Sequence, residues 1–226
     1  MPAGVTAAHL PRSRRPPTPE RLLDAAERLF ARRGYGATSI RDITREAGCN
    51  IAGVNYHFHG KARLYVEVFG RRLTALRKQQ LASVRAALAG ADASGAVGLD
   101  RLECLLNGFA EAFFARLVEP GDGRMLTDLI AIEIADPRLP PGVFAEEYVD
   151  PIERALAGAI RSIVTTLSPE SARRAAHSYW AQLVYEALTR GRAGLLAGRR
   201  RVDPYTGRHI ARFSAGGTGA VSEADP

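Results

Sequence analysis

The sequence predicts an all-helical protein with a three-helix head, a connecting helix and a larger helical body, about nine helices in all. Two observations carry this prediction. Apolar residues recur three, four and seven positions apart through most of the 226 residues, which is typical of helices with one buried face. No stretch of useful length alternates apolar and polar residues as a half-buried strand would. The fold class is therefore all-α.

The first helix is expected over about 19–33. Thr18 can cap its N-terminus, Pro19 suits its first turn, and Gly34 can end it. Its buried face is formed by Leu22, Ala26, Leu29 and Phe30.

Residues 38–64 predict a helix-turn-helix. Ser39 and Asp42 have the spacing of a capping box, and Gly48 can end a short helix in the left-handed conformation. Asn50 can cap the helix that follows. The inward positions are Ile40, Ile43 and Ala47 on the first of these helices and Val54 and Phe58 on the second. The outward side of the second helix is small, polar and aromatic, as expected of a helix that enters a DNA major groove.

The remaining chain divides at proline- and glycine-rich stretches. Further helices are expected at about 60–87, 99–119, 123–135, 143–167 and 169–197. We predict four segments: a disordered basic arm at 1–17, a DNA-binding domain at 18–65, a larger helical domain at 66–202, and a disordered tail at 203–226.

Charge placement supports nucleic-acid binding. The net charge is +7, and all of this excess falls within residues 12–72, while acidic and basic residues balance in the rest of the chain. Phosphate neutralisation would use such an asymmetry. The arm at 1–17 is as readily a solvated leader as a DNA contact.

Other function classes lack their signatures. Cys49 and Cys104 form neither a metal motif nor a disulfide framework, and no apolar run is long enough to span a membrane. Motifs of hydrolases, nucleotide-binding loops and zinc proteases are missing, so we expect no enzyme, no cofactor and no metal. The expected location is the cytoplasm.

The run AGCNIAGVNYHFHGK, between two amphipathic helices, resembles the DNA-binding domain of the TetR family of bacterial regulators. Within that family, NIAGVNYHF followed by a lysine resembles the CecR-like subgroup. The resemblance is specific over residues 20–70. It implies a homodimer on double-stranded DNA, a small-molecule effector bound in the body, and most often repression of a palindromic operator.

Candidate DNA contacts follow from position and from this resemblance. Tyr56 and His57 are expected to donate to phosphate oxygens, and Lys61 to form an anion site where the next helix begins. Arg41 could reach a phosphate or a guanine, or simply be solvated. Gly53 could admit a close approach to DNA, or pack against a neighbouring helix. The full set is Thr38, Ser39, Arg41, Asn50, Ile51, Ala52, Gly53, Asn55, Tyr56, His57 and Lys61.

The body offers weaker signals. Leu183, Ala187, Gly191 and Gly194 form a small apolar stripe that could be a dimer seam or could close the core of a monomer. Glu133, within the run LIAIEIA, must find a partner if it is buried. The candidate effector contacts are Phe109, Phe113, Glu133, Tyr148, His177, Trp180 and Tyr185.

Two functional classes stay open. The first is a ligand-responsive regulator, in which an effector in the body changes the spacing of two heads. The second is an architectural or partner-binding DNA-binding protein without a small-molecule effector. A hollow apolar body would favour the first class, and a filled body the second.

Overall fold

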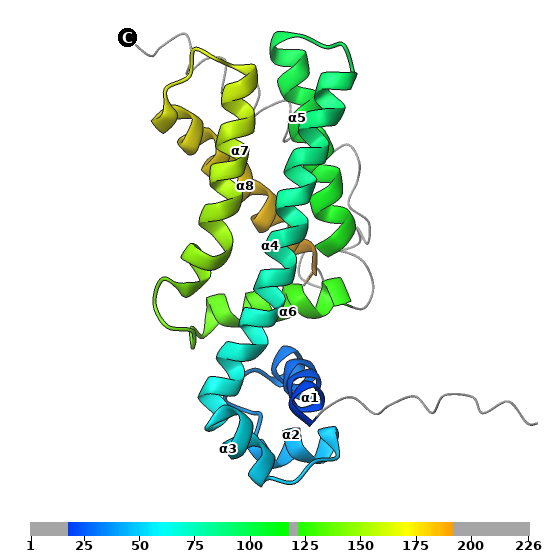
Figure 1. Ribbon diagram of the computed structural model, residues 1–226, viewed down its shortest axis with the longest axis vertical. Helices are drawn as coiled ribbons and strands as arrows, with labels where there is room; N and C mark the ends of the chain where they lie inside the picture. The colour runs from blue at the N-terminus through cyan, green and yellow to red at the C-terminus, as the bar shows by residue number, and fades with distance from the viewer. Residues whose placement is uncertain (1–17, 118–121, 192–226) are drawn as a thin grey trace, which may run out of the picture.

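The computed structural model describes residues 18–117 and 122–191, which form eight α-helices and one π-helical segment without any strand. The predicted all-helical head and body are confirmed (Figure 1). The elements are α1 (Thr18–Arg33), α2 (Ile40–Ala47), α3 (Ala52–Phe58), α4 (Lys61–Ala93), α5 (Gly98–Leu117), α6 (Asp122–Ala135), the π-helical segment η1 (Ala145–Val149), α7 (Asp150–Ile163) and α8 (Pro169–Gly191). The arm at 1–17 and the tail at 203–226 lie outside the described residues.

Local capping chemistry sets the boundaries in the head. The Ser39 hydroxyl accepts the Asp42 N–H at 3.1 Å, and Asp42 accepts the Ser39 N–H at 3.2 Å, so the predicted capping box is present. Gly48 ends α2 with φ of 61°, in the left-handed region that glycine adopts at least cost. Asn50 accepts the Ala52 N–H at 3.0 Å, which caps the start of α3 as predicted.

The three head helices close around one apolar core. The predicted face of α1 is buried, and Ile43 of α2 and Val54 and Phe58 of α3 pack into the same cluster. Because these inward positions are occupied, the intervening positions of α3 must face solvent.

Helix α4 joins the head to the body. Its 33 residues correspond to a rod of about 50 Å, which leaves the head and runs along the whole body (Figure 1). It ends at Ala93 rather than near residue 87 as predicted, since Ala91 is buried and extends the packing of α4 beside α5. Gly95 and Gly98, both at positive φ, make the short turn that follows.

The expected helix at 143–167 differs in detail. Its first turn is the π-helical segment η1, and the regular helix α7 ends at Ile163. Pro151 has no N–H to donate to the carbonyl of Glu147 four residues earlier, which disturbs the α-helical ladder there. Arg77 of α4 donates to that carbonyl at 2.7 Å and to the Glu147 carboxylate at 2.7 Å. The irregular turn is thereby fixed to α4.

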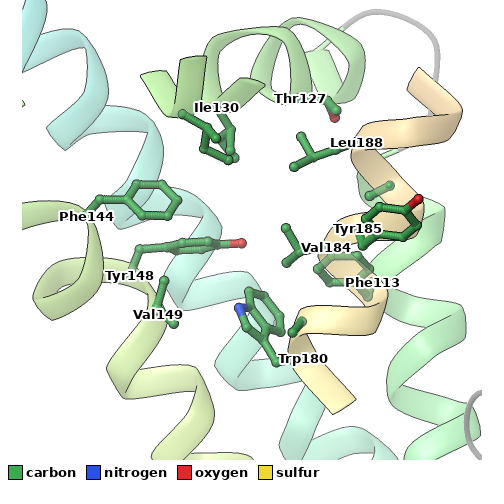
Figure 2. A pocket seen from close by; sticks show the side chains of 13 residues that line it. Phe113, Thr127, Ile130, Phe144, Tyr148, Val149, Trp180, Val184, Tyr185 and Leu188 are labelled. Carbon is green, nitrogen blue, oxygen red and sulfur yellow. The ribbon is translucent and has the colours of Figure 1, made fainter. Parts of the chain in front are cut away.

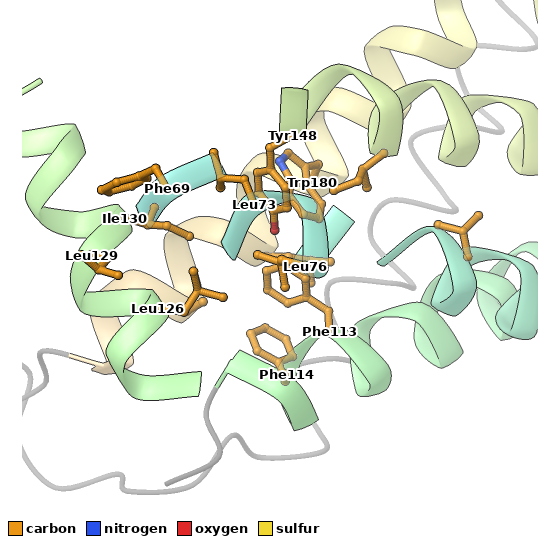
Figure 3. Close-up of a cluster of buried hydrophobic side chains, with 14 of the residues drawn as sticks. Phe69, Leu73, Leu76, Phe113, Phe114, Leu126, Leu129, Ile130, Tyr148 and Trp180 are labelled. Carbon is orange, nitrogen blue, oxygen red and sulfur yellow. The ribbon is translucent and has the colours of Figure 1, made fainter. Parts of the chain in front are cut away.

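The centre of the body is a cluster of buried apolar side chains from α4, α5, α6, η1, α7 and α8, part of which is drawn in Figure 3. It includes Leu73 and Leu76 of α4, Phe113 of α5, Leu129 of α6 and Trp180 of α8. Helix α6 lies across the end of the body that faces the head (Figure 1). It packs against α1 of the head as well as α5 and α8 of the body.

The apolar stripe on the last helix left two possibilities open, and the burial of its two residues with described side chains favours the core. Leu183 and Ala187 are 0% and 3% exposed, so they pack inside the protomer. Helix α8 is described to Gly191 rather than to residue 197, and Gly194 lies outside the described residues.

Candidate functional site

Helix α3 presents a polar and aromatic face to solvent. Tyr56 is 80% exposed and Ile51 is 48% exposed, whereas Val54 and Phe58 point into the head. The Tyr56 and His57 rings meet edge to face, with centroids 4.8 Å apart. The predicted contact residues that are exposed in and around α3 are Asn50, Ile51, Ala52, Asn55, Tyr56 and His57. Arg41 and Ser39 are exposed on the neighbouring helix α2.

Arg21 of α1 holds the turn between α2 and α3. Its guanidinium donates to the Ala47 carbonyl at 3.0 and 2.8 Å and to the Gly48 carbonyl at 2.6 Å. It also contacts the Cys49 sulfur at 2.9 Å. These carbonyls end α2, where a helix leaves its acceptors unsatisfied and attracts cations. Arg21 therefore positions α3, a role that no sequence pattern indicated.

One predicted DNA contact needs correction. Thr38 is only 1% exposed, and its hydroxyl donates to the Gly34 carbonyl at 2.8 Å, so this side chain stabilises the loop before α2. Gly53 lies beside α1, because a methyl group added there would lie 3.6 Å from Leu22 and 3.7 Å from Thr18. These are ordinary van der Waals distances, so packing on α1 does not by itself require glycine at this position.

Two further predicted DNA contacts, Ser39 and Lys61, are engaged within the head. The Ser39 hydroxyl donates to the Asp42 carboxylate at 2.6 Å, which holds the pKa of Asp42 below its usual range. The Lys61 ammonium lies 4.0 Å from the centroid of the Tyr35 ring, a cation–π contact. Partial burial, and then the charge of Arg138, lower the pKa of Lys61.

A buried carboxylate fixes the head to α4. Glu27 of α1 is 1% exposed; it accepts from Arg71 at 2.7 Å and forms a short hydrogen bond with Arg72. Arg71 also donates to Asp24 at 2.7 Å, and these hydrogen bonds raise its pKa against the opposing effect of burial. Asp24 and Glu27 of α1 are thus paired with the adjacent arginines Arg71 and Arg72 of α4. These ion pairs fix the head against the start of α4.

Glu133 of α6 completes the connection to the body. The Tyr65 hydroxyl of α4 donates to its carboxylate at 2.7 Å, and the N–H groups of Arg138 and Leu139 donate at 2.9 and 2.8 Å. Burial, followed by the hydrogen bond to Glu133, raises the pKa of Tyr65. The predicted need for a partner is confirmed by these three donors.

The body contains an apolar cavity of about 340 Å³ (Figure 2), within the usual range of small-molecule sites, roughly 300–1,000 Å³. Its walls come from α5, α6, η1 with the residue before it, and α8, and none of the described residues that line it is charged. They are Phe113, Thr127, Ile130, Ile134, Phe144, Tyr148, Val149, Trp180, Ala181, Val184, Tyr185, Ala187 and Leu188.

Four of the seven predicted effector residues line this cavity: Phe113, Tyr148, Trp180 and Tyr185. The other three lie elsewhere. Phe109 is fully buried behind Trp180, with ring centroids 6.3 Å apart. His177 is exposed on α8 and pairs with Glu153 of α7 at 2.8 Å. Glu133 borders a separate hollow of about 210 Å³, and its oxygens already accept three hydrogen bonds.

Helix α6 is shared between the cavity and the head. Ile130 and Ile134 line the cavity, Glu133 bonds to Tyr65, and Ile132 lies 3.8 Å from the position a methyl group would take on Gly34 after α1. A displacement of α6 would therefore change the two contacts that join it to the rest of the junction, the hydrogen bond between Glu133 and Tyr65 and the packing of Ile132 beside Gly34.

Within residues 18–117 and 122–191, no helix combines the length and hydropathy needed to cross a membrane. In the same part of the chain, no group of three or more His, Cys, Asp or Glu side chains could hold a metal ion.

The exposed α3, the αL turn before it and the basic charge of the head define a helix-turn-helix DNA-binding protein. Residues 22–68 match the family model described as bacterial regulatory proteins, tetR family. The head is therefore similar to the DNA-binding part of that family over residues 22–68, and the described helices have the TetR-family fold, with a helix-turn-helix head and a helical body.

A relative and two solved structures agree with this assignment. The probable HTH-type transcriptional regulator YttP of Bacillus subtilis is 36% identical over 47 residues, which cover 21% of this chain and 23% of YttP. A proposed regulator from Pseudomonas aeruginosa PAO1 is 22% identical, with a TM-score of 0.66 over 94% of this chain and 96% of that one. A proposed regulator from Saccharomonospora viridis, solved in complex with choline, is 24% identical, with a TM-score of 0.58 over 86% and 94% of the two chains. The structural likeness extends the shared fold to the body.

Proposed function

We propose that the protein is a ligand-responsive transcriptional repressor that binds a palindromic operator as a homodimer and is released by a small-molecule effector. The observation that carries this proposal is the position of α6, which lines an apolar cavity on one side and bonds to the head on the other. The hollow body favours an effector over the architectural alternative. The choline bound by the Saccharomonospora relative supports a small-molecule site in this fold.

In the proposed complex, α3 enters the major groove. Asn55 can pair with adenine, and Ile51 and Ala52 can contact thymine methyl groups. Tyr56 and His57 donate to phosphates and set the register of the helix. The Thr38 side chain is excluded from direct contact by its burial inside the head.

We further propose that the head belongs to the CecR-like subgroup of the TetR family. The support is the run NIAGVNYHF followed by Lys61, with Asn55 where tyrosine is more common in the family. An asparagine carries both a donor and an acceptor, which a tyrosine does not present in the same geometry. The subgroup therefore implies a different base preference.

The proposed dimer uses the outer face of α7 and α8. Gly158 of α7 is exposed, and a methyl group added there would meet nothing within 4 Å. Ser178 and Ala181 on α8 are also small and exposed, so two such faces could approach closely. A two-fold pair would place two heads for half-sites one helical turn apart, roughly 34–36 Å.

Effector binding would act through α6. An occupant that moved Ile130 or Ile134 would shift Glu133 on the same helix, and with it Tyr65 at the start of α4. The effector would change DNA affinity only by its difference in affinity for the two head spacings. A filled cavity that left α6 in place would have no effect on the operator.

Selection of bound fragments from random and genomic DNA at near-physiological salt tests the DNA-binding part. One enriched palindrome with half-sites about one turn apart is expected. Asn55→Ala should relax preference at one position, whereas Asn107→Ala, the same truncation in α5, should keep the motif. Binding without any enriched motif would contradict the proposed operator and favour the architectural class.

Gly158→Glu tests the dimer. The side chain fits the protomer without a clash, so the variant should fold but sediment as a monomer and lose operator affinity. Gly90→Glu is the matched control, because Gly90 is equally open and exposed on α4 near the far end of the body. A dimeric Gly158→Glu protein would place the interface elsewhere.

A further inference from the structure

Two hydrogen-bond donors border the cavity without a partner among the described residues. Tyr148 of η1 is 3% exposed and Trp180 of α8 is 4% exposed, and their ring centroids lie 5.8 Å apart. Figure 2 shows the Tyr148 hydroxyl pointing into the cavity and the indole nitrogen of Trp180 on the edge of the ring nearest Tyr148. Neither group makes a hydrogen bond within residues 18–117 and 122–191, whereas the buried phenol of Tyr179 donates to the Leu106 carbonyl. Buried donors are almost always paired, so these two are suited to an external acceptor.

The surroundings define the charge of that acceptor. No described lining residue is acidic or basic, so an ionised ligand would lose its hydration without gaining a counter-ion. The hydrogens of the two donors also carry partial positive charge, which repels a cation in front of them. Burial raises the pKa of Tyr148, and its phenol therefore stays a donor at any physiological pH.

The rest of the wall defines the body of the ligand. Phe113, Phe144, Val184 and Leu188 surround the two donors (Figure 2). Two other hydroxyls lie in the wall. That of Thr127 donates to the Gly123 carbonyl at 3.0 Å, and that of Tyr185 belongs to a side chain that is 67% exposed. A flat or ring-containing apolar molecule would bury most of its surface there.

We infer that the cavity takes a neutral, mainly apolar molecule with one hydrogen-bond-accepting oxygen, such as a ketone, seated against Tyr148 and Trp180. This inference rests on the proposed function, since it names the chemical class of the effector. The acceptor oxygen would satisfy both donors, and the apolar remainder would contact α6 through Ile130 and Ile134.

Trp180 supplies the measurement, because it is the only tryptophan in the chain and lies in the cavity wall. Quenching of its fluorescence is titrated with benzophenone and with diphenylmethane, which share their two rings but differ by the carbonyl. Benzophenone should bind roughly three- to tenfold more tightly, the usual effect of one buried hydrogen bond. Benzyltrimethylammonium serves as the cationic probe and should bind more weakly than both.

Tyr148→Phe should reduce the preference for benzophenone, since Trp180 remains as the one donor, and leave the affinity for diphenylmethane unchanged. Tyr179→Phe is the matched control, because it removes a buried phenol one residue from Trp180 that already has a protein partner, and it should keep the full preference. Equal binding of the two neutral probes, an undiminished preference in Tyr148→Phe, stronger binding of the cation, or no quenching by any probe would each overturn the inference. These outcomes leave the operator selection unaffected, so failure of the ligand class and failure of the DNA-binding proposal are distinguishable.

Discussion

The hydrogen bond between Tyr65 and Glu133 can be tested by a double-mutant cycle. Tyr65→Phe removes only the hydroxyl, since the ring stays packed against Phe30, Tyr35 and Phe69 at centroid distances of 5.0, 5.1 and 4.9 Å. Glu133→Ala removes the acceptor and opens onto the neighbouring hollow of about 210 Å³, where water can reach the released N–H groups. Both single variants are therefore expected to fold.

The expected magnitude follows from the three donors to this buried carboxylate. Two of them, the N–H groups of Arg138 and Leu139, are unaffected by Tyr65→Phe. A hydrogen bond to a charged group contributes about 1.5–3 kcal/mol, so we expect a coupling free energy of that size between the two substitutions. The same energy would change an equilibrium between two head orientations by roughly 10- to 150-fold if only one of them has the bond.

The assay is denaturant unfolding of the wild type, both single variants and the double variant. The control cycle pairs Tyr179→Phe with Glu133→Ala, because Tyr179 donates to Leu106 within the body and does not contact Glu133. The control effects should add within about 0.5 kcal/mol. If the Tyr65–Glu133 cycle is equally additive, this hydrogen bond does not connect the head to the body.

Other substitutions test other parts of the structure. Arg21→Ala should lower the free energy of unfolding by about 1.5–3 kcal/mol and weaken operator binding, because it frees the carbonyls that end α2; unfolding and DNA titration measure both effects. Glu27→Gln should cost about 3 kcal/mol in the same unfolding assay, since two arginines lose a buried charge. Tyr56→Phe should weaken binding to all DNA sequences about equally, which titration of unrelated duplexes checks. Burial raises the pKa of Tyr148 in the folded state, so the neutral phenol stabilises the fold fully below about pH 10, and this stabilisation is lost as the pH rises further. Tyr148→Phe should therefore reduce the decline in the free energy of unfolding above pH 10 by about 1.4 kcal/mol per pH unit.

The head could be predicted in detail because its signals are local. Ser39, Asp42 and Gly48 form caps from residues a few positions apart, and the structure places each as expected. The contacts that hold the head in place could not be predicted in the same way. Arg21 reaches residues 26 to 28 positions away, and Glu27 pairs with arginines 44 and 45 positions away. Nothing in their sequence neighbourhoods distinguishes these residues from solvated charges.

The body shows the same division. Large aromatic residues on apolar helices were good candidates for the cavity wall, since a ring needs space and neighbours, and Phe113, Tyr148 and Trp180 line it. Charged candidates were poor ones. Glu133 and His177 stand out in an apolar sequence, but each is satisfied by a partner from another element, which depends on packing and not on pattern.

The position of Glu133 suggests why a carboxylate occurs in an otherwise apolar helix. A leucine there would leave the Tyr65 hydroxyl and two N–H groups without an acceptor, at a cost of about 1–3 kcal/mol for each. The carboxylate instead accepts hydrogen bonds from α4 and from the loop after α6. These bonds favour one arrangement of α4, α6 and this loop. A change in the cavity that moved Ile130 or Ile134, on the same helix, would act on that arrangement. The charged residue of this helix is thus best explained as part of the junction with the head, while the ligand selection that we propose falls to the uncharged donors Tyr148 and Trp180.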